Sequence, residues 1–281
     1  MTALVVTGWG VATAAGEGAV DTPVWDALEG VRVARAVLPL RAWWPGAPER
    51  IGRMDRPAAH ALLVAQRAFE RAGLVGSIPS DMAVLLGTSL GCAEVNERYH
   101  RGLVERGGEG ASPLLFAQTI PSTSAGEVAI AFGARGHTST VMAGRASGVA
   151  ALVEARRALA LGRASIALVL AIDTVGADRL RLRASRGEAP CAEAAVALVL
   201  EPAPSAIAAG RAPLATLDEA RLTSELAAPA TEQVDWLGAS GLVELVAWID
   251  HGHARSFEAH VGDPSGQVGV LRASRPSATS T

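Results

Sequence analysis

TVMAGRASGVAALVEARRALALGRASIALV, from Thr140 to Val169, is the stretch of this sequence that decides the fold. A short β-branched run ends in the turn Ala143-Gly144, and the segment Gly148–Gly162 that follows has a helical pattern. The next apolar run, Ser165–Ile172, has the length and composition of a buried strand. A strand, a turn, a helix and a second strand in this order predict an α/β protein.

The same alternation extends in both directions along the chain and predicts a sheet with helices on both faces. We expect strands at Ala3–Thr7, Met82–Leu86, Thr138–Met142, Ala194–Glu201, Pro213–Leu217 and Gln267–Leu271. We expect helices at Thr22–Glu29 with Asp21 as N-cap, and at Pro57–Gly73, Ala93–Arg106, Pro121–Phe132 and Gly241–Ile249, with an irregular segment at Val31–Ile51.

The composition limits the class of protein. Of the 281 residues, 49% are hydrophobic, which is enough for a large α/β core. The net charge of −3 gives no sign of a nucleic-acid-binding surface. All 25 basic residues are arginine, so chemistry that needs a lysine Schiff base is excluded.

The cysteines and the apolar runs predict a cytoplasmic protein without membrane contact. Cys92 and Cys191 are too few for a disulfide framework and fit a reducing compartment. We see no signal peptide at Met1–Gly10, and Ser165–Val175 is too short to cross a bilayer. Nothing indicates a cofactor. The spacing of His251 and His253 lacks the third ligand that a metal site needs.

Four groups of segments, in this order, resemble the β-ketoacyl synthase family of the thiolase superfamily. The first group is VTGWGVATAAGEG (Val6–Gly18) with VWDALEG (Val24–Gly30), and the second is RMDRPAAHALLVAQRAFERAGL (Arg53–Leu74). The third is LLGTSLGCAEVNERY (Leu85–Tyr99), SPLLFAQTIPSTSAGEVAIAFGARG (Ser112–Gly136) and the stretch Thr140–Val169 quoted above. The fourth is LGASGLVELVAWI (Leu237–Ile249) with SFEAHVGD (Ser256–Asp263) and QVGVLR (Gln267–Arg272). The resemblance is strong over residues 6–201 and patchier beyond them.

The resemblance implies a thiolase-like layered α/β/α/β/α fold made of two similar halves. Residues 1–201 correspond to a complete ketosynthase-like N-terminal half, 202–271 to an abbreviated C-terminal half, and 272–281 to a disordered tail. Only 36 residues separate Glu201 from Gly238, where family members carry a longer stretch. We therefore infer a deletion between about Leu222 and Val234.

The family's nucleophile is missing. Its cysteine lies in a T-A-C-x-S-G pattern at the start of a helix, and here Arg145 occupies that position, followed by Ala146, Ser147 and Gly148. A guanidinium is not a nucleophile at neutral pH. A cation is also unfavourable at a helix N-terminus. Either the arginine drifted into the position after catalysis was lost and fills the old pocket, or it pairs with an acidic group on this chain or on a partner.

The family's two histidines and its glycine-rich gate are missing as well. One histidine follows a G-T-G-T loop that falls in the inferred deletion, and Asp235 stands at the position of the other. The gate, G-F-G-G in the family, reads Glu258-Ala259-His260-Val261. We predict no catalytic residue and a pseudo-active site formed by Arg145, Ser147, Asp235, Phe257 and His260.

Ketosynthase-like chains without the cysteine resemble the chain-length-factor subunits of polyketide and polyene synthases. The resemblance implies a non-catalytic subunit, a pseudoenzyme, that pairs with a catalytic β-ketoacyl synthase and an acyl carrier protein in fatty acid or polyketide biosynthesis. The family dimerises through the strand before the nucleophile turn, here Ser139, Thr140, Val141 and Met142. We expect a heterodimer through this strand, which would otherwise be an exposed sheet edge.

Two other functions stay open. An acyltransferase or decarboxylase could use a relocated nucleophile, with Cys92 as the candidate. The alternative interpretation of Cys92 is a small buried residue with a structural role. Ser147 would need a histidine base to act as a nucleophile. A homodimer could instead hold an acyl chain or an acyl carrier protein. Resemblance of the fold does not choose among these functions.

Overall fold

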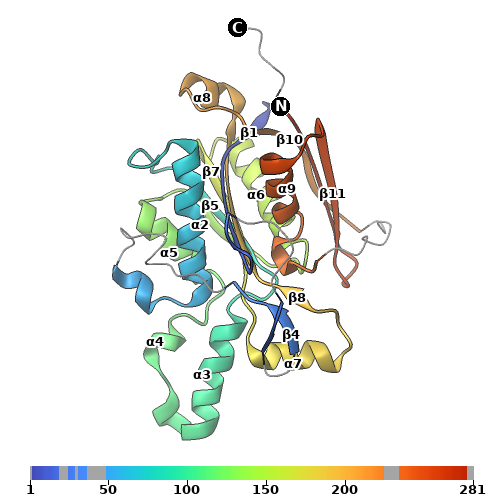
Figure 1. Cartoon of the computed structure of the whole chain (residues 1–281). Coiled ribbons are helices and arrows are strands. Elements are labelled where there is room, and N and C mark those ends of the chain that lie inside the picture. The colour runs from blue at the N-terminus through green and yellow to red at the C-terminus, as the bar shows by residue number, and fades with distance from the viewer. Residues whose placement is uncertain (1, 19–24, 29–30, 37–48, 225–233, 277–281) are drawn as a thin grey trace.

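The computed structural model describes residues 2–18, 25–28, 31–36, 49–224 and 234–276 (Figure 1). The strands are β1 (Leu4–Thr13), β2 (Gly16–Glu17), β3 (Asp26–Leu28), β4 (Val31–Ala34), β5 (Ala83–Gly87), β6 (Thr138–Val141), β7 (Ala167–Asp173), β8 (Cys191–Ala192), β9 (Ala194–Pro202), β10 (Ala215–Thr223), β11 (Ser256–Gly262) and β12 (Val268–Ser274). The α-helices are α2 (Arg56–Ala72), α3 (Ala93–Arg106), α4 (Pro113–Phe116), α5 (Thr123–Phe132), α6 (Ser147–Ala160), α7 (Ala177–Ser185), α8 (Ala203–Ala208) and α9 (Leu242–His251). The 3₁₀ turns within the described residues are η1 (Glu49–Arg53), η2 (Gly107–Gly110) and η3 (Leu237–Ala239).

One large mixed sheet organises the chain, with the strand order β11-β12-β10-β1-β9-β7-β5-β6. Strands β6, β5 and β7 are parallel, and every pairing from β7 through β9, β1, β10 and β12 to β11 is antiparallel. Strand β1 pairs with β9 on one side and, through Leu4–Val6, with β10 on the other. The first strand of the chain therefore joins the N-terminal and C-terminal parts of the sheet.

Helices cover both faces of the N-terminal strands, as the sequence predicts. Helices α2 and α5 lie on one face, and α6 and α9 lie on the other, between these strands and the arm formed by β10, β12 and β11 (Figure 1). Strand β7 is buried along its whole length. Its residues alternate between two cores, with Leu168 and Leu170 facing α2 and Val169 facing α6. The expected layered α/β fold is confirmed.

The outer face of the β10–β12–β11 arm is polar. Arg272 Nη1 lies 2.8 Å from Glu219 Oε2, and Arg272 Nη2 lies 3.0 Å from Glu258 Oε1. His260 Nε2 is also 2.6 Å from that Glu258 oxygen. An antiparallel sheet with one wet, charged face needs no helix against it, and no described helix lies beyond the arm in Figure 1. Within the described residues, the outer face of the β10–β12–β11 arm thus has no helical layer against it.

Some local expectations were wrong. Part of the expected helix Thr22–Glu29 is the strand β3, and β4 lies in the segment expected to be irregular. Both strands belong to a small separate sheet, in which Val33 pairs with Cys191 from a distant part of the chain. Such pairing overrides local helix preference. Asp21, residues 37–48, most of the inferred deletion and residues 277–281 lie outside the described residues.

The C-terminal strands also extend beyond the expected bounds. Strand β10 runs nine residues from Ala215, and the expected closing loop at Glu258–Val261 is part of strand β11. Strand β12 continues through Ser274, past the expected start of the tail at Arg272. Ser274 is paired on both sides, with Ser256 and Thr216, and this pairing keeps the segment in the sheet.

Helix α2 packs directly on the backbone of β1. A Cβ added at Gly8 would overlap the carbonyl oxygen of Ala68 and lie 2.8 Å from Ala72 Cβ. Both groups belong to a buried helix and cannot move aside cheaply.

We therefore expect Gly8→Ala to lower the free energy of unfolding by about 3 kcal/mol through overpacking. Gly126→Ala is the matched control, because Gly126 lies in α5 with open space around its missing side chain, and alanine favours helix. Urea unfolding of the two variants measures the difference. Equal stability of the two would contradict the close packing of α2 on β1.

The N-cap of α2 is a buried carboxylate. Asp55 Oδ1 accepts a hydrogen bond from Ala58 N at 3.0 Å, and the residue is 4% exposed. Burial raises the pKa of Asp55 from 3.8 to about 6. The folded state therefore binds this proton more tightly than the unfolded state does.

Ionisation of Asp55 costs stability, and this cost grows as the pH rises from about 4 to about 6. Asp55→Asn keeps the capping oxygen without the charge. Relative to wild type, the variant should gain about 2 kcal/mol of unfolding free energy between about pH 4 and about pH 7. Urea titrations at both pH values give this difference. If the difference in unfolding free energy were the same at both pH values, burial would not raise the pKa of Asp55.

Candidate functional site

The turn between β6 and α6 is held rigidly by the groups around it. Gly144 has a φ of +53°, a left-handed conformation that glycine adopts without strain. Ser147 is fully buried, and its Oγ accepts a hydrogen bond from Ala143 N at 2.9 Å and lies 2.9 Å from the carbonyl oxygen of Thr88. Ser147 therefore braces the turn from the start of α6, and no histidine is among its hydrogen-bond partners.

Arg145 pairs with acidic groups of the same chain. Its Nε lies 3.0 Å from Asp235 Oδ1. Its backbone N–H donates to Asp263 Oδ2 at 2.9 Å. Of the two interpretations of Arg145, the structure supports pairing with an acid. Arg145 and Asp235, the residues inferred to stand at the family's cysteine and histidine positions, are in contact.

Asp235 lies between two arginines. Its Oδ2 accepts from Arg183 Nη2 at 2.8 Å, and its Oδ1 accepts from Leu237 N at 3.1 Å. Arg183 also pairs with Glu188 at 3.1 Å. The four side chains of Arg145, Asp235, Arg183 and Glu188, here called the charge chain, connect the start of α6 with η3 and α7.

The charge chain explains how a cation is tolerated at the N-terminus of α6. The partial positive charge of that helix end disfavours Arg145, and the carboxylates of Asp235 and Asp263 offset it. Glu244, in the first turn of α9, adds a third nearby carboxyl. Burial raises the pKa of Glu244, and the positive charge of Arg145 opposes that rise.

A buried carboxylate behind the turn was missed in the sequence. Asp173, at the end of β7, accepts from Thr88 Oγ1 at 2.7 Å, from Leu90 N at 2.8 Å and from Gly238 N at 2.7 Å. Burial raises the pKa of Asp173, and these hydrogen bonds oppose the rise. The carboxylate ties the loops after β5 and before α9 to β7. The sequence did carry a signal for this buried carboxylate, because Asp173 directly ends a continuous apolar strand.

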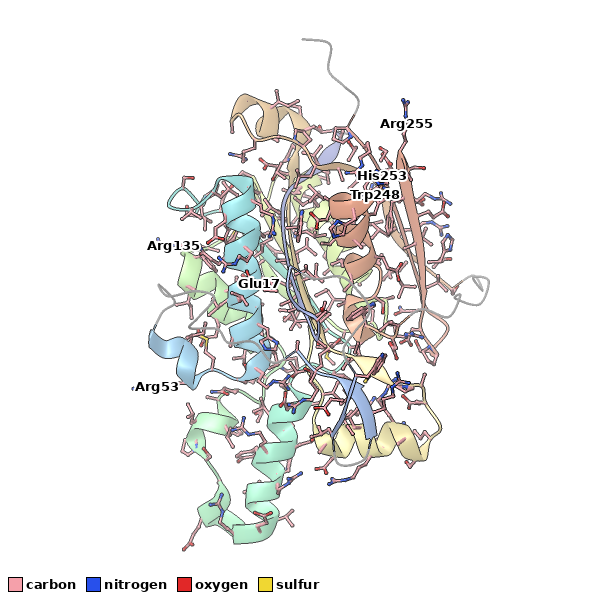
Figure 2. All side chains as sticks on the ribbon, viewed as in Figure 1. Glu17, Arg53, Arg135, Trp248, His253 and Arg255 are labelled. Atoms are coloured by element: carbon pink, nitrogen blue, oxygen red, sulfur yellow. The ribbon has the colours of Figure 1, made fainter. Side chains whose placement is uncertain are left out.

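Two residues expected at the pseudo-active site have other partners. His260 faces outward on β11 beside Glu258, so placing it in the pocket was wrong. Phe257 packs on Trp248, with ring centroids 5.8 Å apart, and Trp248 projects from α9 in Figure 2. The loop after β11 reaches the turn instead, through Asp263. The alternation of side chains along β11 turns His260 away from the core. Phe257 faces inward, but it lies at the start of β11, at the other end of the strand from Asp263.

The cysteines are buried. Cys92 Sγ lies 3.0 Å from the carbonyl oxygen of Thr119 and 3.4 Å from Asn96 Nδ2, and burial raises its thiol pKa. Burial also raises the pKa of Cys191 to about 11. Since the thiolate is the nucleophilic form, both environments suppress reactivity.

Two histidines and two cavities were also considered as possible sites. His251 pairs with Asp250, and His253 is exposed near the end of α9 (Figure 2). Across the described ranges, no group of three or more His, Cys, Asp or Glu side chains could hold a metal ion. A groove of about 840 Å³ separates α3 from α7, and a smaller cavity of about 240 Å³ borders Arg183 and Glu188. None of the described helices has the length and apolar character needed to cross a membrane.

Residues 41–195, more than half of the chain, match the family model described as the N-terminal domain of β-ketoacyl synthase. The chain belongs to the β-ketoacyl synthase family. A putative polyketide β-ketoacyl synthase 1 from Streptomyces halstedii is 34% identical over 197 residues, which are 61% of this chain and 46% of that relative. The match therefore spans less than half of the relative's length.

Solved structures share the fold over nearly the whole chain. The ishigamide ketosynthase/chain length factor superposes with a TM-score of 0.78 at 18% identity, covering 97% of this chain and 99% of the other. A type II polyketide synthase acyl-carrier protein in complex with its ketosynthase gives a TM-score of 0.79 at 15% identity, covering 98% and 100%. The fold is that of the thiolase-like ketosynthases.

Removing the charge of Asp235 should leave Arg145 and Arg183 facing each other without a carboxylate between them. We expect Asp235→Asn to lower the unfolding free energy by about 3 kcal/mol, because a partner of a buried ion pair is lost. Arg145→Ala should cost less, about 1 kcal/mol, since the guanidinium is one third exposed. Urea unfolding gives both values.

Glu188→Gln is the control for this experiment. Glu188 lies at the exposed end of the charge chain, with 34% of its side chain accessible, so its substitution should cost under about 1 kcal/mol. If Asp235→Asn were as mild as Glu188→Gln, Asp235 would not be the central member of the charge chain.

Proposed function

We propose that this chain is a non-catalytic, chain-length-factor-type subunit that pairs with an active β-ketoacyl synthase. The contact between Arg145 and Asp235 supports the absence of catalysis. In place of a thiol and an imidazole, the two positions hold a guanidinium and a carboxylate in an ion pair. A guanidinium cannot attack a thioester, and an ionised carboxylate cannot donate a hydrogen bond to a developing oxyanion.

The observation that carries the pairing proposal is the open edge of the large sheet. Strand β6 is the last strand and, among the described residues, pairs only with β5. Exposed apolar side chains lie on the adjoining segments: Met142 is 54% exposed, Ile120 56% and Ile130, on α5, 68%. Thr140 Oγ1 is shielded from solvent and has no hydrogen-bond partner within the described chain. A bare strand edge flanked by apolar side chains favours strand-to-strand association.

The partner's identity is argued from the relatives. One solved relative is a ketosynthase/chain length factor, and another is an acyl-carrier protein in complex with its ketosynthase. By analogy, we propose that a catalytic ketosynthase covers β6 and that an acyl carrier protein delivers substrate to the pair, in polyketide or fatty acid biosynthesis. The two buried free thiols fit a reducing, cytoplasmic location.

The relocated-nucleophile alternative finds little support. Cys92 is 6% exposed, its pKa is raised, and its polar neighbours are an amide and a backbone carbonyl. The hydrogen bond from Asn96 Nδ2 favours a thiolate, but burial outweighs it and the net effect is a raised thiol pKa. A homodimer that binds an acyl chain would use the same strand edge, so it is an outcome of the experiment below.

Co-expression with the ketosynthase encoded beside this chain tests the proposal. Size-exclusion chromatography should show a heterodimer, and the product profile of the condensation assay should change when this chain is omitted. Separate elution with unchanged products would overturn the proposal. A homodimer with bound lipid in native mass spectrometry would support the acyl-binding alternative.

Substitution at the strand edge locates the interface. Ile120→Glu should weaken the heterodimer roughly tenfold or more, because a charge would be buried against an apolar partner surface. Ile207→Glu is the matched control, since Ile207 is 58% exposed on α8, away from β6. Isothermal titration of each variant with the ketosynthase gives the affinities. Equal weakening by both variants would place the interface elsewhere.

A further inference from the structure

The large sheet has a second open edge, on the side opposite β6. Strand β11 is the last strand on that side and, among the described residues, pairs only with β12. It lies at the right-hand edge of the sheet in Figure 1. An edge strand offers unpaired backbone groups to any further strand that fits it.

Hydrogen bonds at the two ends of β11 show which of its backbone groups face outward. Arg275 N donates to Arg255 O at 2.8 Å, and Asp263 N donates to Gln267 O at 2.8 Å. Along an antiparallel strand, residues that bond to one neighbour alternate with residues that face the other side. The odd-numbered residues of β11 therefore bond to β12. The even-numbered residues present their backbone N–H and C=O groups to the open edge: Ser256, Glu258, His260 and Gly262.

The sequence of β11, SFEAHVG, is complementary to itself when two copies run in opposite directions around Ala259. This register places Glu258 of one copy opposite His260 of the other, so that an acid meets a base twice. It also places Ser256 opposite Gly262. All four of these residues have outward-facing backbone groups, so they meet as hydrogen-bonded pairs.

The inner face of the strand matches in the same register. Phe257 of one copy stands opposite Val261 of the other, in a non-hydrogen-bonded pair, where side chains approach most closely. Val261 is 6% exposed, and Phe257 packs on Trp248 with ring centroids 5.8 Å apart. Pairing of two copies would therefore bring the apolar layer of one arm against that of the other.

Charged side chains on an edge strand ordinarily discourage pairing, but here the carboxylate has an oxygen to spare. Arg272 Nη2 and His260 Nε2 both lie beside Glu258 Oε1, and no described group bonds to Oε2. Hydrogen bonds from Arg272 and His260 lower the pKa of Glu258 to about 2, so the group is ionised at neutral pH. Both nitrogens of a protonated imidazole are donors, so His260 can bridge the Glu258 side chains of two copies.

We propose that a second copy of this chain docks on β11, in an antiparallel two-fold pairing centred on Ala259 that continues the sheet from one copy into the next. A two-fold interface uses the same strand on both copies and closes on itself. The pairing uses the edge opposite β6 and does not rest on association with a ketosynthase, so both contacts fit into one assembly.

Analytical ultracentrifugation of the full chain alone, over a range of concentrations, tests the pairing. We expect a monomer–dimer equilibrium. His260→Pro removes an N–H that faces the open edge and leaves the bonds to β12 intact. His260→Ala is the matched control, because it removes the same side chain and keeps the N–H. Proline should raise the dimer dissociation constant roughly tenfold or more above that of the alanine variant. Equal constants for the two variants overturn the proposal, as does a wild-type chain that stays monomeric.

Two charge variants test the register, and they decide the question if His260→Pro does not fold. His260→Glu and Glu258→Arg each place like charges opposite each other in the dimer, so each alone should weaken it roughly tenfold. An equimolar mixture of the two should restore the wild-type affinity, because opposite charges meet again. Failure of the mixture to do so overturns the register.

Two further variants separate this interface from other surfaces. His100→Glu makes the same change at an exposed histidine on α3, away from the β10–β12–β11 arm (Figure 1), and should leave the dimer unchanged. Ile120→Glu, near β6, should also leave it unchanged. If Ile120→Glu abolished self-association, the two copies would meet at the β6 edge, and the proposal for β11 would be wrong.

Discussion

The structure depends on the close packing of one helix, α6, between the N-terminal strands and the β10–β12–β11 arm. A Cβ at Gly148 would lie 2.9 Å from the Gly238 carbonyl oxygen and 3.1 Å from Leu242 Cδ1. A Cβ at Gly269 of β12 would lie 2.9 Å from Val149 Cβ. Backbone and side-chain atoms of separate segments approach the start of α6 this closely, so packing fixes the turn before it.

Charge placed at this fixed turn has to be compensated where it stands. Arg145 brings a cation to the positive end of α6, and Asp235 and Asp263 approach it from two separate segments. Asp173 performs a related structural task behind the turn, where it gathers backbone N–H groups from two loops. The acidic groups hold these loops together, although burial of each carboxylate carries a desolvation cost.

The fold of the β-ketoacyl synthase family is thus retained around a turn that carries the ion pair of Arg145 and Asp235. The β10–β12–β11 arm is compatible with water, since its outer face carries Glu219, Glu258 and Arg272. Exposed ion pairs of this kind add little stability. Their value lies in making the face hydrophilic, whereas Ile120, Ile130 and Met142 are exposed near β6, at the opposite edge of the sheet.

The sequence by itself determined the elements that local patterns encode. Apolar spacing and glycine stops located α2, α3, α5, α6 and α9, and buried runs located β5, β7 and β9. Motif order identified Arg145 and Asp235 as residues of one site. The resemblance also indicated the layered fold, because the order of motifs along the chain reflects the order of elements in the family.

Only the tertiary structure decided which distant groups meet. Strands β3 and β4 exist because β4 pairs with β8, and β11 because it lies in register with β12. The contact of Asp263 with Arg145 N–H and the convergence of hydrogen bonds on Asp173 depend on how the sheet and loops are placed. A residue pattern reports the preference of a segment for helix or strand. Contacts between segments depend on register and packing, which a local pattern does not contain.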